Sequence, residues 1–180
     1  MKQMKVLSIL GIALGVLTIG CVAESQQAPD TAPPASLDAL LGETFVNAEG
    51  KTIGAETLAD KEVIALYFSA VWCPPCRAFT PRLVEAANEL REAGKPFEII
   101  FVSSDRSADA MQGYMQDYNM PWLALPFGDA KIRELGGRYG IRGIPALVVI
   151  DGDGNTITTQ GRNDIASQGA KAYDKWVASE

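Results

Sequence analysis

The chain has 180 residues, 47% of them hydrophobic, and a net charge of −6, because 22 acidic residues outnumber 16 basic ones. This length suits one domain preceded by a leader, and the acidic balance argues against a nucleic-acid partner and against binding to anionic lipid by charge alone. There is no histidine and there are three cysteines, too few ligands for one chain to close a four-ligand zinc site of nitrogen and sulfur. We expect no cofactor and no bound metal, with copper handling by a pair of thiols as the alternative.

Residues 1–23 have the pattern of a signal peptide. Lys2 and Lys5 precede an apolar run from Val6 to Ile19, and small residues follow it. We therefore predict an exported protein, placed in the periplasm or on another extracytoplasmic face. An uncleaved membrane anchor is the alternative, because residues 6–23 just reach the minimum length that spans a bilayer.

The end of this leader offers two cleavage routes. Residues 17–21 resemble a bacterial lipobox in which Cys21 is acylated, with Thr18 in place of the usual aliphatic residue. Cleavage after Ala23 is the competing route. Both routes cap or remove Cys21, so the mature protein keeps Cys73 and Cys76 as its only thiols. The leader holds two basic residues and no acidic one, so its loss takes the net charge from −6 to −8.

Residues 24–36 are rich in Gln, Ala and Pro and show no apolar periodicity, which is typical of a linker. On a lipidated protein this segment would tether the following domain to the membrane. From residue 37 to residue 180 the pattern alternates between strands and helices. This alternation predicts one α/β domain.

The domain is expected to begin with a hairpin of residues 44–46 and 52–53. The order that follows is β-α-β-α-β-β-α, which implies a central mixed sheet flanked by helices on both faces. In chain order the expected elements are a buried strand at 63–68, a helix at 74–93, a buried strand at 97–102, a helix capped by Ser107 and running to Tyr118, a short helix at 129–139, a hairpin of 146–150 and 156–159, and a closing helix at 165–177.

The segment Trp72-Cys73-Pro74-Pro75-Cys76 is the strongest functional signal. Two thiols three positions apart can close a reversible disulfide, and a strand before them and a helix after them place the pair at a helix start. Backbone N–H groups and the helix dipole favour a thiolate there. Pro74 and Pro75 have no N–H to offer, so the N–H of Cys76 remains as the donor to Cys73.

The helix period assigns different roles to the two cysteines. Cys76 shares one face with a set of apolar residues that must pack on the sheet, namely Phe79, Leu83, Ala87 and Leu90. We therefore predict that Cys73, at the exposed helix start, attacks a disulfide and that Cys76 resolves the mixed disulfide from beneath. Arg77 is expected to help stabilise the thiolate, a solvated surface arginine being the alternative.

A second motif precedes the predicted strand at 146–150. Pro145 follows Ile144 and could be an ordinary residue at the start of a strand. With WCxxC upstream, it more specifically indicates a cis-proline loop that faces the dithiol. The backbone edge at Ile144 would then pair with a substrate peptide.

These motifs together resemble the thioredoxin superfamily, and within it the tryparedoxin and nucleoredoxin group. The resemblance covers residues 37–176 and rests on residues 65–81, 101–105, 120–127 and 141–145. It implies a thioredoxin-like fold and a protein-disulfide reductase with a Cys73–Cys76 redox centre. The implied partners are protein disulfide or dithiol clients and an electron donor that the sequence does not identify.

The chain departs from the family in two respects. Thioredoxins carry a buried acid six residues before the first cysteine, where Tyr67 stands here, as an aromatic residue does in the tryparedoxin-like group. Asp105 is then a candidate proton acceptor for Cys76, with a helix N-cap as the alternative. Second, tryparedoxins and nucleoredoxins are largely intracellular, so in its predicted placement the chain instead resembles exported bacterial thiol reductases of the TlpA and ResA type.

Two other functions fit part of the pattern. A peroxiredoxin-like thiol peroxidase needs Thr or Ser three residues before the peroxidatic cysteine, where Ala70 stands. A copper-handling module is compatible with the sequence, because two thiolates can hold Cu(I). A disulfide reductase explains more of the residues than either.

Overall fold

The computed structural model describes residues 36–178; the predicted signal peptide, Cys21 and all but the last residue of the linker lie outside this range. The strands of this part are β1 (Thr44–Val46), β2 (Thr52–Gly54), β3 (Val63–Ser69), β4 (Phe97–Ser103), β5 (Leu123–Ala124), β6 (Ala146–Asp151) and β7 (Thr156–Thr158). The helices are α1 (Leu37–Leu41), α2 (Pro74–Glu92), α3 (Ala108–Asp117), α4 (Ala130–Arg138), α5 (Gly161–Gln168) and α6 (Ala172–Val177), with 3-10 turns η1 (Ala55–Leu58) and η2 (Gly169–Lys171). Across residues 36–178 no helix has the length and apolar character needed to cross a bilayer.

The strands form one mixed sheet of order β2-β1-β5-β4-β3-β6-β7. β3 lies at its centre, parallel to β4 from Val63 opposite Phe97 to Ser69 opposite Ser103, and antiparallel to β6. β5 is parallel to β4, and β1 is antiparallel to β5. The carboxyl ends of β3 and β4 therefore meet at one edge of the sheet, where the segment leading to Cys73 begins.

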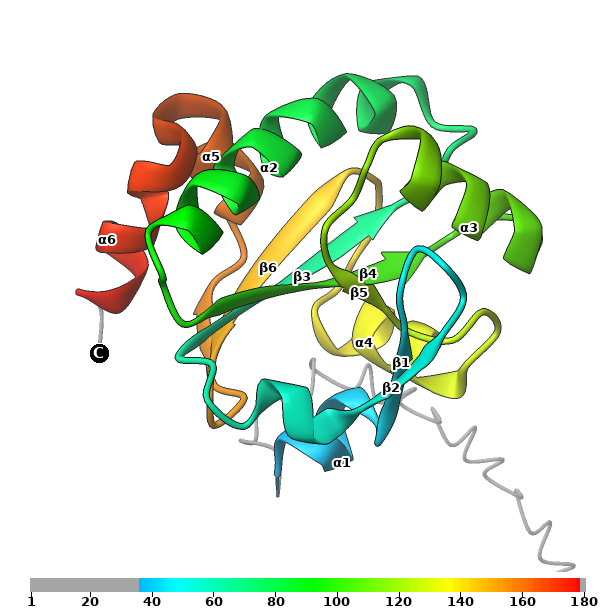
Figure 1. Cartoon of the computed structure of the whole chain (residues 1–180), viewed down its shortest axis with the longest axis horizontal. Coiled ribbons are helices and arrows are strands. Elements are labelled where there is room, and N and C mark those ends of the chain that lie inside the picture. The colour runs from blue at the N-terminus through cyan, green and yellow to red at the C-terminus, as the bar shows by residue number, and fades with distance from the viewer. Residues whose placement is uncertain (1–35, 179–180) are drawn as a thin grey trace, which may run out of the picture.

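All seven residues of β3 are buried, as predicted for a strand covered on both faces. Alternate side chains enter two separate cores. Residues 63, 65 and 67 pack with α2, α3 and α6, whereas residues 64, 66 and 68 pack with α1, η1 and α4. In Figure 1, α2, α5 and α6 lie together on one side of the sheet and α1 lies on the other. The predicted mixed sheet between two helix layers is confirmed.

The helix after the CxxC motif also follows the predicted pattern. Pro74 and Pro75 occupy its first turn, where an N–H is not required, and Cys73 is its N-cap. Its buried face is formed by Cys76, Phe79, Thr80, Leu83, Ala86, Ala87 and Leu90. Burial of a leucine of this kind contributes about 1.5–3 kcal/mol relative to exposure. This face holds Cys76 against the sheet.

The last helix was predicted incorrectly as a single element. Instead, α5 begins earlier, at Gly161, and a 3-10 turn at Gly169 separates it from α6. Gly169 has a φ of +58°, outside the conformations that continue a right-handed helix. Gly161 packs against β6 so closely that an added Cβ would lie 2.8 Å from Cγ2 of Val149. The strand β5, the helix α1 and the turn η1 were also not anticipated, because each is very short.

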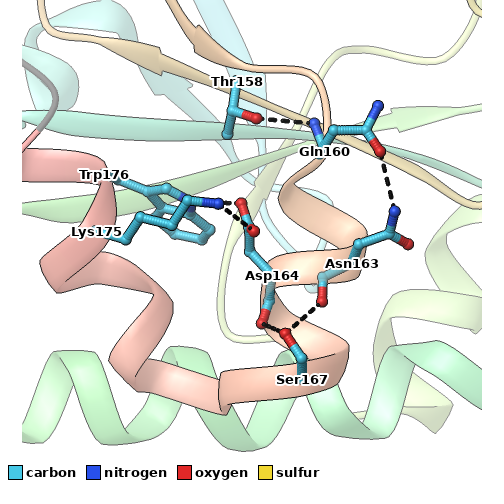
Figure 2. Close-up of polar contacts among 7 residues, drawn as sticks. All are labelled: Thr158, Gln160, Asn163, Asp164, Ser167, Lys175 and Trp176. Carbon is cyan, nitrogen blue, oxygen red and sulfur yellow. Dashed lines mark hydrogen bonds and ion pairs between the residues drawn. The ribbon is translucent and has the colours of Figure 1, made fainter.

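α5 and α6 are joined by a buried acid (Figure 2). Asp164 accepts hydrogen bonds from Nζ of Lys175 at 2.7 Å and from Nε1 of Trp176 at 3.1 Å. Burial by itself raises the pKa of Asp164, but the hydrogen bonds from Lys175 and Trp176 and the charge of Lys175 outweigh it, so the pKa lies below the usual range. The charged carboxylate therefore stabilises the folded state.

We expect Asp164→Asn to reduce stability at neutral pH and to matter less in acid. Because the folded-state pKa is lowered, the stabilisation is fully present above the unfolded-state value of about 3.9 and is lost as the pH falls through the folded-state value. Urea unfolding of the wild type and Asp164→Asn at pH 7 and at about pH 3 checks this expectation. A stability difference that grew as the pH fell would contradict it.

Candidate active site

Cys73 and Cys76 form a disulfide at the start of α2, with an S–S distance of 2.25 Å, a χ3 of 72° and a Cα–Cα distance of 5.2 Å. Cys76 lies on the buried face of the helix and is fully buried. The N–H of Cys76 donates to Sγ of Cys73 at 3.3 Å. The predicted pairing and the predicted backbone donor are both confirmed.

Cys73 is less accessible than its place at the helix start led us to expect. Only 3% of its surface is exposed, whereas 47% of the neighbouring Trp72 is exposed. The expectation of an exposed Cys73 is wrong because a second loop faces the sulfur: Sγ lies 3.7 Å from the carbonyl oxygen of Ile144. The inward orientation of Cys76 still distinguishes the two cysteines.

The loop facing the disulfide is the one predicted from Pro145. The Ile144–Pro145 peptide bond is cis, and Ile144 is half-buried. Its carbonyl contact with Cys73 joins residues 71 positions apart in the chain. The disulfide therefore lies at the first turn of α2 and faces the loop that enters β6.

The segment before Cys73 is held by polar side chains. Asp105 accepts the N–H of Val71 at 2.8 Å, and Arg77 donates to the carbonyl of Val71 at 2.8 Å. The indole N–H of Trp72 donates to the carbonyl of Ser104 at 2.9 Å. Arg77 is thus exposed, but its guanidinium is bound to a backbone carbonyl and is not solely solvated. The expected stabilisation of the Cys73 thiolate by Arg77 stays a prediction.

The alternative interpretation of Asp105 as a helix N-cap is wrong. Ser107 caps α3 by accepting from the N–H of Ala110. The carboxylate oxygens of Asp105 instead accept from Val71 and from the hydroxyl of Ser103, each at 2.8 Å. These bonds tie it to the segment before Cys73.

Four buried hydroxyl groups lie beneath Cys76, contributed by β3, α2 and α3. Thr80 Oγ1 is 2.8 Å from the hydroxyl of Tyr67 and 2.5 Å from that of Tyr114. Ser69 Oγ donates to Tyr67 at 3.0 Å and lies 3.3 Å from Tyr114. Thr80 also donates to the carbonyl of Cys76 at 2.9 Å. The four hydroxyl oxygens therefore form a ring of close contacts, and Thr80 joins this ring to the backbone of the inner cysteine.

The hydroxyl hydrogen of Thr80 is directed to the backbone of Cys76. A carbonyl can only accept, so the hydroxyl hydrogen of Thr80 is used there, and Thr80 Oγ1 accepts from Tyr67 and Tyr114. Burial raises the pKa of Tyr67 above its usual range, so Tyr67 stays neutral at physiological pH. The group at the position of the thioredoxin acid is therefore not an anionic base.

Sequence reasoning missed the roles of Ser69, Thr80 and Tyr114. Thr80 stands one helical turn after Cys76, which is the only local sign of its contact with that carbonyl. Tyr114 lies on the buried face of α3 with Met111 and Met115, and helical periodicity accounts for that burial but not for the contacts of its hydroxyl. Within residues 36–178, no group of three or more Cys, Asp or Glu side chains is placed to hold a metal.

Comparison with known proteins identifies relatives of the whole domain. Residues 60–156 match the thioredoxin-like family. Probable nucleoredoxin 1 of Arabidopsis thaliana is 42% identical over 141 residues, or 77% of this chain and 24% of the relative. Nucleoredoxin of Bos taurus is 46% identical over 122 residues, or 67% of this chain and 27% of the relative. The chain thus spans about a quarter of the length of these relatives.

Solved structures of similar size show the same fold. A thioredoxin from Wuchereria bancrofti is 40% identical, with a TM-score of 0.67 over 78% of this chain and 98% of that one. Tryparedoxin I from Crithidia fasciculata is 36% identical, with a TM-score of 0.67 over 74% of this chain and 92% of that one. The chain therefore belongs to the thioredoxin-like family, in its tryparedoxin and nucleoredoxin group, and the Cys73–Cys76 pair is its redox disulfide.

Proposed function

We propose that this protein is an extracytoplasmic thiol–disulfide oxidoreductase that reduces disulfides in client proteins. The observation that carries the proposal is the placement of the Cys73–Cys76 disulfide at the N-terminus of α2, against the carbonyl of Ile144. A helix N-terminus favours the thiolate of Cys73, and the adjacent loop offers a backbone edge on which a client peptide can lie.

The reaction transfers two electrons from the reduced pair to the client. The Cys73 thiolate attacks one sulfur of the client disulfide; the S–S bond of the client breaks, and its other sulfur leaves as a thiolate that takes up a proton. Cys76 then gives up its proton and attacks Sγ of Cys73, which releases the second client thiol and leaves the Cys73–Cys76 disulfide. An external dithiol donor must reduce that disulfide before the next cycle.

The N–H of Cys76 is a hydrogen-bond donor to Sγ of Cys73 in both the oxidised and the reduced form of the pair. In the disulfide form it donates to Sγ of Cys73 at 3.3 Å, so the same donor is in place when that sulfur becomes a thiolate. Pro74 and Pro75 contribute no N–H of their own, which makes this donor the nearest one on the first turn of α2.

The location is proposed from the leader pattern of residues 1–23. Outside the cytosol a dithiol becomes oxidised unless a donor supplies electrons, so a reductase there needs a dedicated reducing partner. Acylation of Cys21 would tether the domain to the membrane through residues 24–36, whereas cleavage after Ala23 would release it. Both forms leave the redox pair unchanged.

One expression of the full chain in a bacterium tests the activity and the location together. We expect insulin-reducing activity, driven by dithiothreitol, in the periplasmic or membrane fraction, and none from the Cys73→Ala variant in the same fraction. Activity that stays in the cytosolic fraction would overturn the location alone. Purified protein that speeds insulin reduction no more than Cys73→Ala does would overturn the activity.

A further inference from the structure

The segment between β3 and α2 is held by side chains rather than by strand pairing. Pairing of β3 with β4 ends at Ser69 and Ser103, and a bond from the N–H of Ser104 to the carbonyl of Ser69, at 2.9 Å, closes the ladder. Residues 70–72 therefore approach Cys73 beyond the last ladder bond to β4.

Asp105 supplies the contact that strand pairing no longer makes. Its Oδ1 accepts the N–H of Val71, two residues before Cys73, at 2.8 Å. Its Oδ2 accepts the hydroxyl of Ser103 at 2.8 Å, and Ser103 Oγ accepts the N–H of Asp105 at 3.0 Å. The carboxylate is bound at both oxygens and only 9% exposed, so it has little freedom to turn.

The other backbone polar group of Val71 is bound by a different side chain. Its carbonyl accepts from Nη1 of Arg77 at 2.8 Å. The N–H and the carbonyl of one residue belong to successive peptide planes, so the two bonds together fix both planes. Together with the bond from the indole of Trp72 to the carbonyl of Ser104, these two contacts hold the chain where it enters Cys73; the bond to Asp105 is partly buried, whereas those from Arg77 and Trp72 are exposed.

We propose that Asp105 is a positioning residue for Cys73, which acts through the Val71 peptide, and that it is not the proton acceptor of Cys76. This inference rests on the proposed oxidoreductase function. Sγ of Cys73 lies 3.3 Å from the N–H nitrogen of Cys76 and 3.7 Å from the carbonyl oxygen of Ile144. A shift of the backbone before Cys73 moves the sulfur relative to both, and misplacement of a reacting atom by about 1 Å costs up to ~100-fold in rate.

Two substitutions separate positioning from proton transfer. Asp105→Ala removes the acceptor of the Val71 N–H. Asp105→Asn keeps an oxygen for Val71 and turns an amide N–H toward Ser103 Oγ, but it removes the charge and any function as a base. The measurements are the second-order rate of the reduced protein with an aromatic disulfide, and the pH profile of Cys73 alkylation by iodoacetamide.

We expect Asp105→Ala to slow the reaction of Cys73 by roughly tenfold or more, and Asp105→Asn to keep the wild-type rate and pH profile. Asp164→Ala is the matched control, because Asp164 is similarly buried, at 6% exposure, and also holds neighbouring segments by hydrogen bonds (Figure 2). It should lower the melting temperature without changing the reaction of Cys73.

The inference is overturned if Asp105→Ala behaves like Asp164→Ala and lowers only the melting temperature. It is also overturned if Asp105→Asn loses as much rate as Asp105→Ala and its pH profile lacks one ionisation, since that result assigns a base. Should Asp105→Ala fail to fold, Ser103→Ala decides, because it removes the two bonds of Ser103 to Asp105, at Oδ2 and at the backbone N–H, that hold the carboxylate in place; an unchanged rate there would refute the role. A wild-type protein that reduces no disulfide refutes the proposed function instead.

Discussion

Cys76→Ser is expected to stop the reaction at the mixed disulfide and to reduce turnover of protein disulfides by roughly a thousandfold or more. The variant keeps the thiolate of Cys73, but the serine hydroxyl cannot attack the Cys73–client bond. Because Cys76 is fully buried on the inner face of α2, the change leaves the face seen by the client intact. Covalent complexes should appear on non-reducing gels, and mass spectrometry of the trapped species identifies the clients.

Cys73→Ser is the matched control for the trapping experiment. It leaves the thiol of Cys76, which is fully buried on the inner face of α2 and so is out of reach of a client disulfide. We expect no mixed disulfides and no turnover. If Cys73→Ser traps the same partners as efficiently as Cys76→Ser, the assignment of the attacking and resolving roles is wrong.

Tyr67→Asp is expected to destabilise the domain strongly, although an acid stands at this position in thioredoxins. Tyr67 is fully buried, and its ring centroid lies 6.0 Å from those of Phe79 and Phe101 and 6.2 Å from that of Trp122. Loss of an aromatic ring from such a core costs about 3–5 kcal/mol. A buried carboxyl without matched partners adds about 1–3 kcal/mol.

Tyr67→Phe separates the ring from the hydroxyl in this experiment. It keeps the aromatic contacts and removes one member of the hydroxyl ring, so we expect a loss of about 1–3 kcal/mol from the partners left unpaired. Urea unfolding at neutral pH measures both variants. Equal stability of Tyr67→Asp and the wild type would show that the ring contacts contribute little and that the site accepts a thioredoxin-like acid.

Several of the elements on which these predictions rest could be predicted from the sequence, and others could not. The buried strand at Val63, the helix from Pro74 with its inward Cys76 and the loop at Pro145 were all predicted from local patterns. Such patterns suffice because side chains repeat every two residues in a strand and about every 3.6 in a helix. The short elements were missed for the same reason: two residues of β5 are too few to show a period.

The closing helix shows where local pattern misleads. The apolar residues from Ile165 onward have helical spacing, and the sequence alone does not show that Gly169 adopts a φ of +58°. Glycine in a helix interior costs only about 1 kcal/mol, so its presence does not by itself predict a break. The packing of α5 on β6 and the bonds of Asp164 to α6 determine where the helix divides.

The sequence by itself determined the fold family, the redox pair and which of its two thiols faces inward. Tertiary structure alone decided what surrounds that pair: the hydroxyl ring beneath Cys76, the hold of Asp105 on Val71, and the low exposure of Cys73. The physical reason is sequence separation. Asp105 meets Val71 across 34 positions, and Ile144 meets Cys73 across 71 positions. Contacts of that range depend on how the strands order themselves in the sheet, which no local periodicity encodes.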